Sequence, residues 1–250
     1  MRGDYVGVMD DTYAADRKRK KHLIFRYRVR ARAVEAAAKQ HLDLTKPLRI
    51  LDFGSADGLT LLELSQLIPN ATYLGIEYSE KLIISAPKLP KNIRIIKGDV
   101  MDLPKEAKHE PYDLVTALAV LEHLPDPQKA VNEAADTLRP GGIFVATCPH
   151  PFWEKASTKL GFLKDDQHTT ELNMEKMSEL ALKAGLEVLS RRPFMWAPTT
   201  LTPYLGVTVP PQTSLKTDQF LASLRILDWS FTNQCITARK PLNKKPAKQV

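Results

Sequence analysis

The sequence has little cysteine and no long uninterrupted apolar segment. Its 250 residues include 2 cysteines, Cys148 and Cys235, and each lies in an apolar run of strand length. Two isolated cysteines do not make a disulfide framework or a zinc site, so we predict buried, reduced thiols and no metal centre. No run approaches the roughly 18 apolar residues that a bilayer span needs, and residues 1–4 do not open a signal peptide. These absences favour a globular protein of the cytoplasm.

Acidic residues are scarce at the two ends of the chain. Residues 1–46 hold 12 Lys and Arg against 6 Asp and Glu, and residues 238–250 hold 5 against none. The net charge is +7, so the rest of the chain is mildly acidic. The basic ends could meet an anionic substrate, a lipid surface or nucleic acid. Alternatively, they are a solvated helix face and a tail, 240–250, whose Lys and Pro content favours disorder.

Residues 15–41 contain neither glycine nor proline and predict one long helix. Apolar residues recur there at spacings of three and four, as an amphipathic helix requires: Ile24, Tyr27, Ala31, Val34 and Ala38. The turn at Lys46–Pro47 follows it. The other face of this helix is strongly basic and carries Arg17, Lys18, Arg19, Lys20, Lys21, Arg26, Arg28, Arg30 and Arg32.

After this helix, apolar runs of strand length alternate with helical patterns, which indicates βα units and a parallel sheet. A turn at 139–142 leads into the fifth strand, 151–173 is expected to be irregular, and the prolines of 193–211 exclude the interior of a sheet. The predicted strands are 49–52, 72–76, 93–97, 114–117, 143–147, 186–190 and 233–238. The predicted helices are 59–68, 80–86, 128–138, 174–184 and 217–227, with one helical turn near Lys105.

The first predicted strand leads into a glycine-rich loop, residues 54–58. Glycine lets the backbone turn tightly and approach a ligand at the carboxyl end of a strand, and the start of the next helix offers unpaired N–H groups to an anion. An ordinary β-to-α turn is the alternative. Because position 59 is Leu, the loop lacks the G-x-G-x-x-G spacing of dinucleotide-binding proteins, which disfavours a nicotinamide dehydrogenase.

Carboxylates follow the next two strands. Glu77 lies 23 residues after Gly54, where a carboxylate can bind a ribose diol. Asp99 follows the third strand and could bind the amine of an adenine. Either acid alone is typical of a cap or turn. Because the carboxyl ends of parallel strands meet at one edge of a sheet, together with the loop they predict a nucleotide-like ligand there.

The segments DFGSADG, GIEYS, GDVMDLP, YDLVTALAVLEHLPDP and LRPGG, in this order and spacing, resemble the class I methyltransferases of the type 11 and related small-molecule groups. The resemblance covers residues 48–150 and, more faintly, 168–190. It implies an α/β, doubly wound, mostly parallel seven-stranded Rossmann-like sheet with an antiparallel last strand. The implied cofactor is S-adenosyl-L-methionine, with S-adenosyl-L-homocysteine as product.

The resemblance also implies which residues contact the cofactor. One position, Ala56, departs from the glycine that many members have, and a methyl group there should not block binding. The implied set is Asp52, Gly54, Ser55, Ala56 and Gly58 around the methionine part, Glu77 on the ribose, Tyr78 beside the adenine, Asp99 and Val100 on its amine, and Ala117, Leu118 and His123 near the sulfonium.

Methyl transfer is an in-line displacement that depends mainly on alignment, which can supply roughly 7–11 kcal/mol. A hydroxyl acceptor would also need a general base near neutral pKa, and His123, His150 and His168 are the candidates. His123 is as readily a structural hydrogen-bonding residue. Asp165 and Asp166 either orient a histidine or cap a turn.

The acceptor should be selected by the basic helix, residues 151–173 and the Pro-rich segment 193–216. Their aromatic residues either line an apolar pocket or bury this segment against the sheet. A pocket beside a basic helix would suit an acceptor with an apolar part and an anion, such as an acyl or isoprenoid phosphate, a quinone precursor or a carboxylate. The aromatic set is Phe152, Trp153, Phe162, Phe194, Trp196 and Tyr204.

Two other functions stay open. One is a partner protein that holds the cofactor without catalysis. The other is an RNA methyltransferase using its basic ends, with steeply salt-dependent binding. Residues 117–120 lack the Asn/Asp-Pro-Pro-aromatic tetrad of amino-directed nucleic-acid methyltransferases, which disfavours the second. We expect one domain with a basic helix (1–47), a cofactor core (48–150), substrate-side elements (151–232), a last strand (233–239) and a tail (240–250). The oligomeric state is open.

Overall fold

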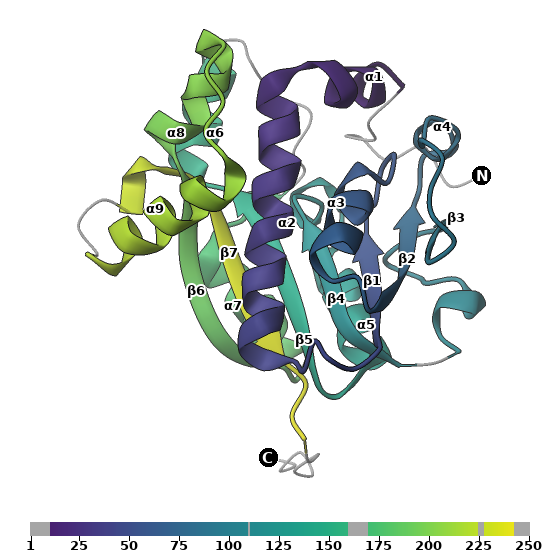
Figure 1. Ribbon diagram of the computed structural model, residues 1–250. Coiled ribbons are helices and arrows are strands. Elements are labelled where there is room, and N and C mark those ends of the chain that lie inside the picture. The colour runs from purple at the N-terminus through teal and green to yellow at the C-terminus, as the bar shows by residue number, and fades with distance from the viewer. Residues whose placement is uncertain (1–10, 110, 160–169, 225–227, 243–250) are drawn as a thin grey trace.

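The computed structural model describes residues 11–109, 111–159, 170–224 and 228–242 (Figure 1). Within them one seven-stranded sheet has the order β3-β2-β1-β4-β5-β7-β6. β7 runs antiparallel to β5 and β6, and the pairs among β1 to β5 are parallel. The predicted sheet with an antiparallel last strand is confirmed. Its strands are β1 Leu48–Phe53, β2 Ala71–Glu77, β3 Ile93–Lys97, β4 Tyr112–Leu118, β5 Leu138–Pro149, β6 Glu187–Trp196 and β7 Phe231–Arg239.

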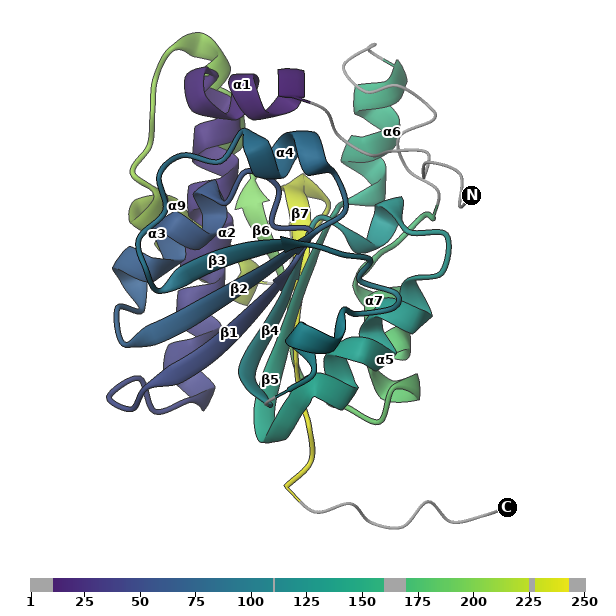
Figure 2. The ribbon, with the colours of Figure 1, turned by 90° about the vertical axis from the view of Figure 1, so that its right-hand side faces the viewer.

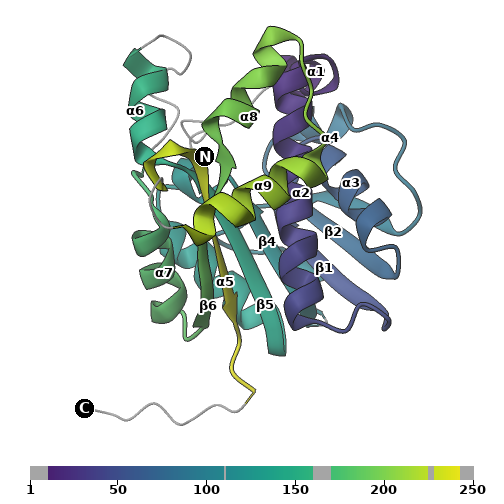
Figure 3. The same ribbon diagram turned by 60° about the vertical axis from the view of Figure 1, so that its left-hand side comes forward.

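Helices cover both faces of the sheet. α2, α3 and α9 pack on one face, where α9 lies beside α2, and α5 and α7 pack on the other (Figures 1 and 3). The helices of the described residues are α1 Asp11–Arg19, α2 Lys21–His41, α3 Leu59–Leu67, α4 Glu80–Ile84, α5 Pro127–Thr137, α6 Pro151–Lys159, α7 Met174–Lys183, α8 Ala197–Leu201 and α9 Pro211–Ser223, with 3-10 turns η1 Lys105–Ala107, η2 Leu121–His123, η3 Thr202–Leu205 and η4 Asp228–Ser230.

Each strand of the middle of the sheet contributes to two hydrophobic cores. In β1, Leu51 and Phe53 face the core under α5 and α7, whereas Leu48 and Ile50 face the core under α2 and α3. This alternation follows from the two-residue repeat of a strand. Because both faces are buried, the strands read in the sequence as continuous apolar runs, which is why they could be predicted.

The predicted helix 15–41 is two helices. Lys20 has an extended backbone (φ −78°, ψ 115°) and separates α1 from α2. The break turns α1 over the carboxyl ends of β1 and β2, where it lies next to α4 (Figure 2). A helical period reports the apolar face of a continuous helix and cannot reveal a change of direction, so the prediction was wrong at this point.

Four later features of the chain also differ from the prediction. Residues 151–159 form α6, which begins at Pro151, a position that tolerates proline because its N–H would be unpaired anyway. β6 continues through Pro193 to Trp196, which is possible because β6 is an edge strand. The turn expected at 139–142 lies within β5, beside an irregularity in its register with β4. α9 also begins earlier than predicted, at Pro211.

Both cysteines lie within strands, Cys148 in β5 and Cys235 in β7, as predicted. Cys148 and Cys235 are buried and free. None of the helices in the described ranges is long and apolar enough to cross a bilayer.

Candidate functional site

The loop between β1 and α3 adopts an unusual backbone. Gly54 and Gly58 have φ of 66° and 75°, and Ala56 between them has φ of 50°. A Cβ on Gly54 would lie 2.5 Å from Cγ2 of Val120, and one on Gly58 would lie 2.8 Å from Cδ1 of Ile95. Left-handed backbone costs free energy for a residue other than glycine and persists where the surroundings enforce it, often at functional sites.

Glu77 holds this loop against the end of β2. Its Oε2 accepts a hydrogen bond from Ala56 N (2.8 Å), and its Oε1 accepts one from Ser79 N (2.8 Å). Burial raises the pKa of the Glu77 carboxyl, while these backbone hydrogen bonds lower it. The predicted ribose-binding acid therefore lies directly beside the predicted methionine-binding loop.

Asp52, the second buried acid of the site, lies on β1. Thr116 of β4 donates a hydrogen bond from its hydroxyl to Asp52 Oδ1 (2.6 Å). Burial raises the pKa of Asp52 to about 7, and the negative charge of Glu77 raises it further. The hydrogen bond from Thr116 and the positive charge of Arg17 lower this pKa. A cation bound nearby would favour the ionised form, so the end of β1 suits a positively charged ligand group.

Ser55 points away from the loop surface. It is buried, and a Cβ on Gly75 of β2 would collide with its hydroxyl. The side chain thus lies on the sheet side of the loop, and its assignment to the cofactor, which stays a prediction, concerns the backbone.

The residues after β3 form a tight turn. Asp99 Oδ1 accepts a hydrogen bond from Met101 N (2.9 Å), which is the turn-forming role that the sequence left open. Val100 is buried in the core under α5 and α7, and Tyr78, after β2, is half-buried. The predicted adenine side of the site consists of these three residues.

The end of β4 lies beside the loop. Phe53 of β1 is in register with Ala117, which is fully buried, and Leu118 is half-buried. Ala119 follows with φ of 59°. Predicted residues from β1, β2 and β4 are therefore brought together at one edge of the sheet.

The three candidate histidines differ in their surroundings. His150 precedes α6, and its Nδ1 accepts a hydrogen bond from Phe152 N (3.2 Å), so it caps that helix. Burial lowers the pKa of His150, which favours the neutral imidazole, with the remaining N–H on Nε2. His123 is half-buried in η2. His168 lies outside the described residues, as do Asp165 and Asp166. Their catalytic roles stay predictions.

Two arginines expected on the outer face of the N-terminal helix point inward instead. Arg17 is 8% exposed, and its Nε lies 3.2 Å from Asp57 Oδ1. Arg30 donates a hydrogen bond from Nη2 to Asn233 Oδ1 of β7 (3.3 Å), and burial lowers its pKa to about 10. One sequence signal existed for Arg30: it directly precedes Ala31 and so lies at the edge of the apolar stripe.

The predicted aromatic set is divided between a surface cluster and the core. Phe152 is 52% exposed and meets Trp153 and Trp229 edge to face, with ring centroids 5.5 and 6.3 Å apart. Trp229 was not among the aromatic residues predicted from the sequence. Phe194 is buried in the core under α2, and Tyr204 stacks on His22 at 4.2 Å. Trp196 is half-buried, and Phe162 lies outside the described residues.

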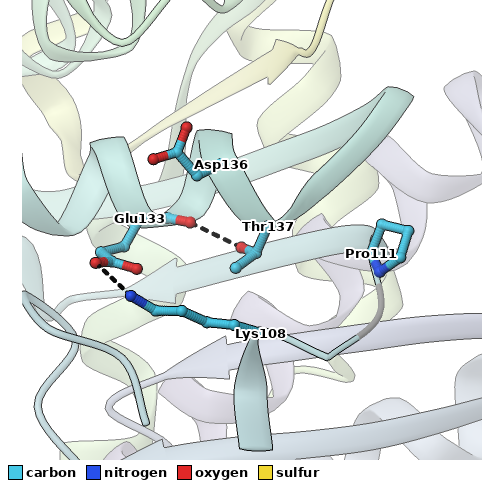
Figure 4. A pocket seen from close by; sticks show the side chains of 5 residues that line it. All are labelled: Lys108, Pro111, Glu133, Asp136 and Thr137. Carbon is cyan, nitrogen blue, oxygen red and sulfur yellow. Dashed lines mark hydrogen bonds and ion pairs between the residues drawn. The ribbon is translucent and has the colours of Figure 1, made fainter. Parts of the chain in front are cut away.

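A separate hollow of about 280 Å³ lies elsewhere (Figure 4). Lys108 and Pro111 line it just before β4 begins, so it adjoins the amino end of that strand. Glu133 accepts from Lys108 Nζ at 2.9 Å across it. The hollow is therefore unrelated to the residues that gather at the carboxyl ends of the strands. Asp136 and Thr137 complete its lining.

The residues at the carboxyl ends fit S-adenosylmethionine. The left-handed φ of Gly54 and Gly58 turns the loop tightly at the end of β1, and the side chains of Val120 and Ile95 pack against these two glycines. Asp52 and Glu77 are buried carboxyls of the kind that hold an ammonium group and a ribose diol. Gly58 precedes α3 without a side-chain cap, which leaves helix N–H groups for a carboxylate.

Comparison with known proteins supports the same assignment. A family model described as "Methyltransferase domain" matches residues 19–191. The chain is 30% identical to trans-aconitate 2-methyltransferase of Deinococcus radiodurans over 57% of this chain and 54% of that protein. It is 32% identical to a ubiquinone biosynthesis O-methyltransferase of Coxiella burnetii over 43% and 46%. The chain thus spans about half the length of the curated relatives it matches.

A solved structure extends the likeness to the whole fold. It is the complex between the Haloferax volcanii Trm112 methyltransferase activator and the putative methyltransferase, with a TM-score of 0.63, 19% identity and coverage of 94% of this chain and 99% of that one. The family model spans more than half of the sequence and includes the loop, Glu77 and the end of β4. The chain belongs to the class I S-adenosylmethionine-dependent methyltransferases.

Proposed function

We propose that the protein methylates a small-molecule acceptor that joins an apolar part to an anionic group. When bound, S-adenosylmethionine supplies an activated methyl group on its sulfonium. The observation that carries the acceptor class is Arg30, whose partly desolvated guanidinium lies beside the start of β7. We further propose the cytoplasm as its location, in keeping with the free cysteines.

The loop 54–58, Asp52 and Glu77 would hold the methionine part and the ribose of the cofactor. Tyr78, Asp99 and Val100 follow on the adenine side, and Ala117 and Leu118 lie toward the acceptor. This assignment rests on their common edge of the sheet and on the fit of the donor groups.

The acceptor side is built around Arg30. Its Nε is inaccessible to solvent and makes no hydrogen bond within the described residues, and the same holds for Nε of Arg26, one helical turn earlier. The negative charge of Glu122 raises the pKa of Arg30, whereas the positive charges of Arg26 and Arg17 lower it. A desolvated guanidinium gains free energy from a carboxylate or phosphate that accepts from its remaining N–H groups. An anionic acceptor would satisfy Arg30 in this way.

This chain's residues would mainly orient such an acceptor. A carboxylate is ionised at neutral pH, so no protein group has to remove its proton. A reaction without a general base suits this site, because Nδ1 of His150 already accepts a hydrogen bond from Phe152 N at the start of α6. The names of the relatives point the same way, since one is named for trans-aconitate, an anion, and another for ubiquinone biosynthesis.

The surface charges of α1 and α2 disfavour an RNA substrate. Many of the cations predicted to form a bare basic face have acidic partners. Asp16 pairs with Arg19 and Lys20, and Glu63 pairs with Arg28. Glu35 likewise pairs with Arg32 and Lys39. Three carboxylates thus offset part of the charge of five cations, which leaves fewer free cations for phosphate and for the counterion release that drives RNA binding.

The test is transfer of labelled methyl from S-adenosylmethionine to a panel of carboxylates, acyl phosphates and quinone precursors, each beside a neutral analogue such as its ester. Arg30→Gln should raise KM for the anionic acceptor by about tenfold or more, because a charge-assisted hydrogen bond is lost. Arg28→Gln is the matched control, since Arg28 pairs with Glu63 at the surface, and should change KM by less than about twofold.

Three results would contradict the proposal. A preference for neutral acceptors and equal effects of the two variants would each remove the anionic class. Failure of the wild-type protein to bind S-adenosylhomocysteine in calorimetry would remove the enzyme itself.

A further inference from the structure

α1 packs directly on the cofactor loop. Ala14 of α1, Ala56 of the loop and Leu82 of α4 form a small buried cluster, with Tyr13 against it. Nζ of Lys18 donates to Ser85 O (2.6 Å) and links α1 to the end of α4. Figure 2 shows the two helices together at the end of the sheet to which β1 and β2 run. The N-terminal helix therefore forms part of the wall around the loop.

Arg17 is the buried charge of this wall. Its Nη2 donates to Thr60 Oγ1 (3.0 Å), in the first turn of α3. Its guanidinium lies 5.6 Å from the ring centroid of Tyr13 and 5.5 Å from that of Tyr27, and these contacts fix its plane. Nε faces Asp57 but makes no hydrogen bond within the described part of the chain. Because a guanidinium carries five N–H donors, Arg17 keeps donors for a further acceptor.

The start of α3 meets Arg17 at the same place. Gly58 at the N-cap gives no side-chain hydrogen bond, and Leu59 N has a long contact of 3.4 Å to Asp57 Oδ1. The first N–H groups of a helix have no partner within the helix and attract negative charge. A fixed, buried guanidinium and an uncapped helix start thus converge on one point beside the loop.

The charges nearby indicate which ligand group belongs there. Arg17 lies close enough to Asp52 and Glu77 to lower the pKa of both. The methionine part of the cofactor carries two cationic groups and one carboxylate. The buried acids suit the cations, which leaves Arg17 and the start of α3 for the carboxylate.

We propose that Arg17 is a cofactor-binding residue whose guanidinium binds the methionine carboxylate of S-adenosylmethionine, so that α1 completes the cofactor site. This inference rests on the proposed cofactor. It assigns a specific function to the N-terminal basic helix, whose role the sequence left open.

The test compares two ligands that differ by the carboxylate alone: S-adenosylhomocysteine and 5′-(3-aminopropyl)thioadenosine. Calorimetry of the full chain with Arg17→Gln should show about 10- to 100-fold weaker binding of the first, and a change of less than threefold for the second. Arg19→Gln, at an exposed position of α1 where the side chain pairs with Asp16 of the same helix, should leave both affinities within twofold.

A double variant separates ligand binding from loop structure. Arg17→Gln with Asp57→Asn removes both members of the buried ion pair, so no uncompensated charge remains to distort the loop. The selective loss for S-adenosylhomocysteine should persist in it, and circular dichroism should match the wild type.

Three results would overturn the inference. In the first, both ligands lose affinity equally. In the second, the double variant regains wild-type binding of S-adenosylhomocysteine. Either result means that Arg17 stabilises the loop and does not bind the carboxylate. In the third, the wild-type protein binds neither ligand, which removes the proposed function as well.

Discussion

At the scale of single residues, the loop 54–58 depends on backbone conformations that few side chains permit. Gly54 and Gly58 combine left-handed φ with a lack of space for a Cβ. Ala56 and Ala119 accept left-handed φ as L residues. Strain of this kind accumulates where β1 and β4 end, which agrees with a ligand site there.

Gly54→Ala should lower the free energy of unfolding by about 1–3 kcal/mol, because it combines strained φ with a clash against Val120. Adding Val120→Ala should restore part of the loss by removing the 2.5 Å contact, while the φ penalty of about 1–2 kcal/mol remains. Urea denaturation measures both. A single variant as stable as the wild type, or complete restoration in the double variant, would contradict this account.

Asp52 should make stability and cofactor binding depend on pH. Its pKa is about 7 in the folded chain and about 3.9 when unfolded, so the folded state holds the proton more tightly. The resulting stabilisation is fully present below about pH 4 and is lost as pH rises through about 7. Asp52→Asn should reduce this dependence, as measured by urea unfolding from pH 5 to pH 8, and Asp218, whose pKa burial raises to about 6, should retain part of it.

Binding of the cationic methionine part should act in the opposite sense on Asp52, because it favours the ionised carboxyl. Affinity for S-adenosylmethionine should therefore rise from pH 6 to pH 8 with release of a proton, measured by calorimetry in buffers of different ionisation enthalpy. A proton release that is unchanged in Asp52→Asn would rule Asp52 out as its source.

At the scale of elements, the end of β6 depends on one buried acid of α9. Asp218 Oδ2 accepts from Met195 N (2.8 Å), and its Oδ1 accepts from Trp196 N (2.9 Å). Met195 has φ of 60°, so the strand bends at this point. The two hydrogen bonds hold the bend and direct the chain from β6 into α8.

Asp218→Asn should lower the free energy of unfolding by about 1–3 kcal/mol despite its similar shape, because the amide nitrogen would face a backbone N–H and leave it unpaired. Gln219→Ala is the control on the exposed side of α9 and should stay within about 0.5 kcal/mol. Equal midpoints in urea for the two variants would show that the hydrogen bonds to Asp218 do not hold the bend.

At the scale of the whole molecule, the cofactor loop, Glu77 and the end of β4 belong to one sheet, so a bound ligand should stabilise the entire fold. S-adenosylhomocysteine at 100 times its Kd should add about 2.7 kcal/mol, which corresponds to a rise in Tm of about 5–11 °C. A thermal scan with NAD at equal concentration is the control and should show no shift. The absence of a shift with S-adenosylhomocysteine would count against the cofactor.

The sequence by itself determined the alternation of strands and helices and the edge at which the site lies. β1 covers 48–53, around the predicted 49–52, and could be found because strands buried on both faces are continuous apolar runs. The loop 54–58 and Glu77 could be found because their chemistry is local: glycines and acids directly follow strands, and parallel strands bring their ends together.

Only the tertiary structure decided which cations face the site. The break at Lys20 directs Arg17 onto the loop, and α2 carries Arg30 to Asn233, 203 residues away in the sequence. A helical period distinguishes an apolar stripe from a polar face, but it cannot distinguish a polar face in solvent from one that covers a ligand site. That difference depends on which distant segment packs opposite, and here this is the start of β7, near the other end of the chain.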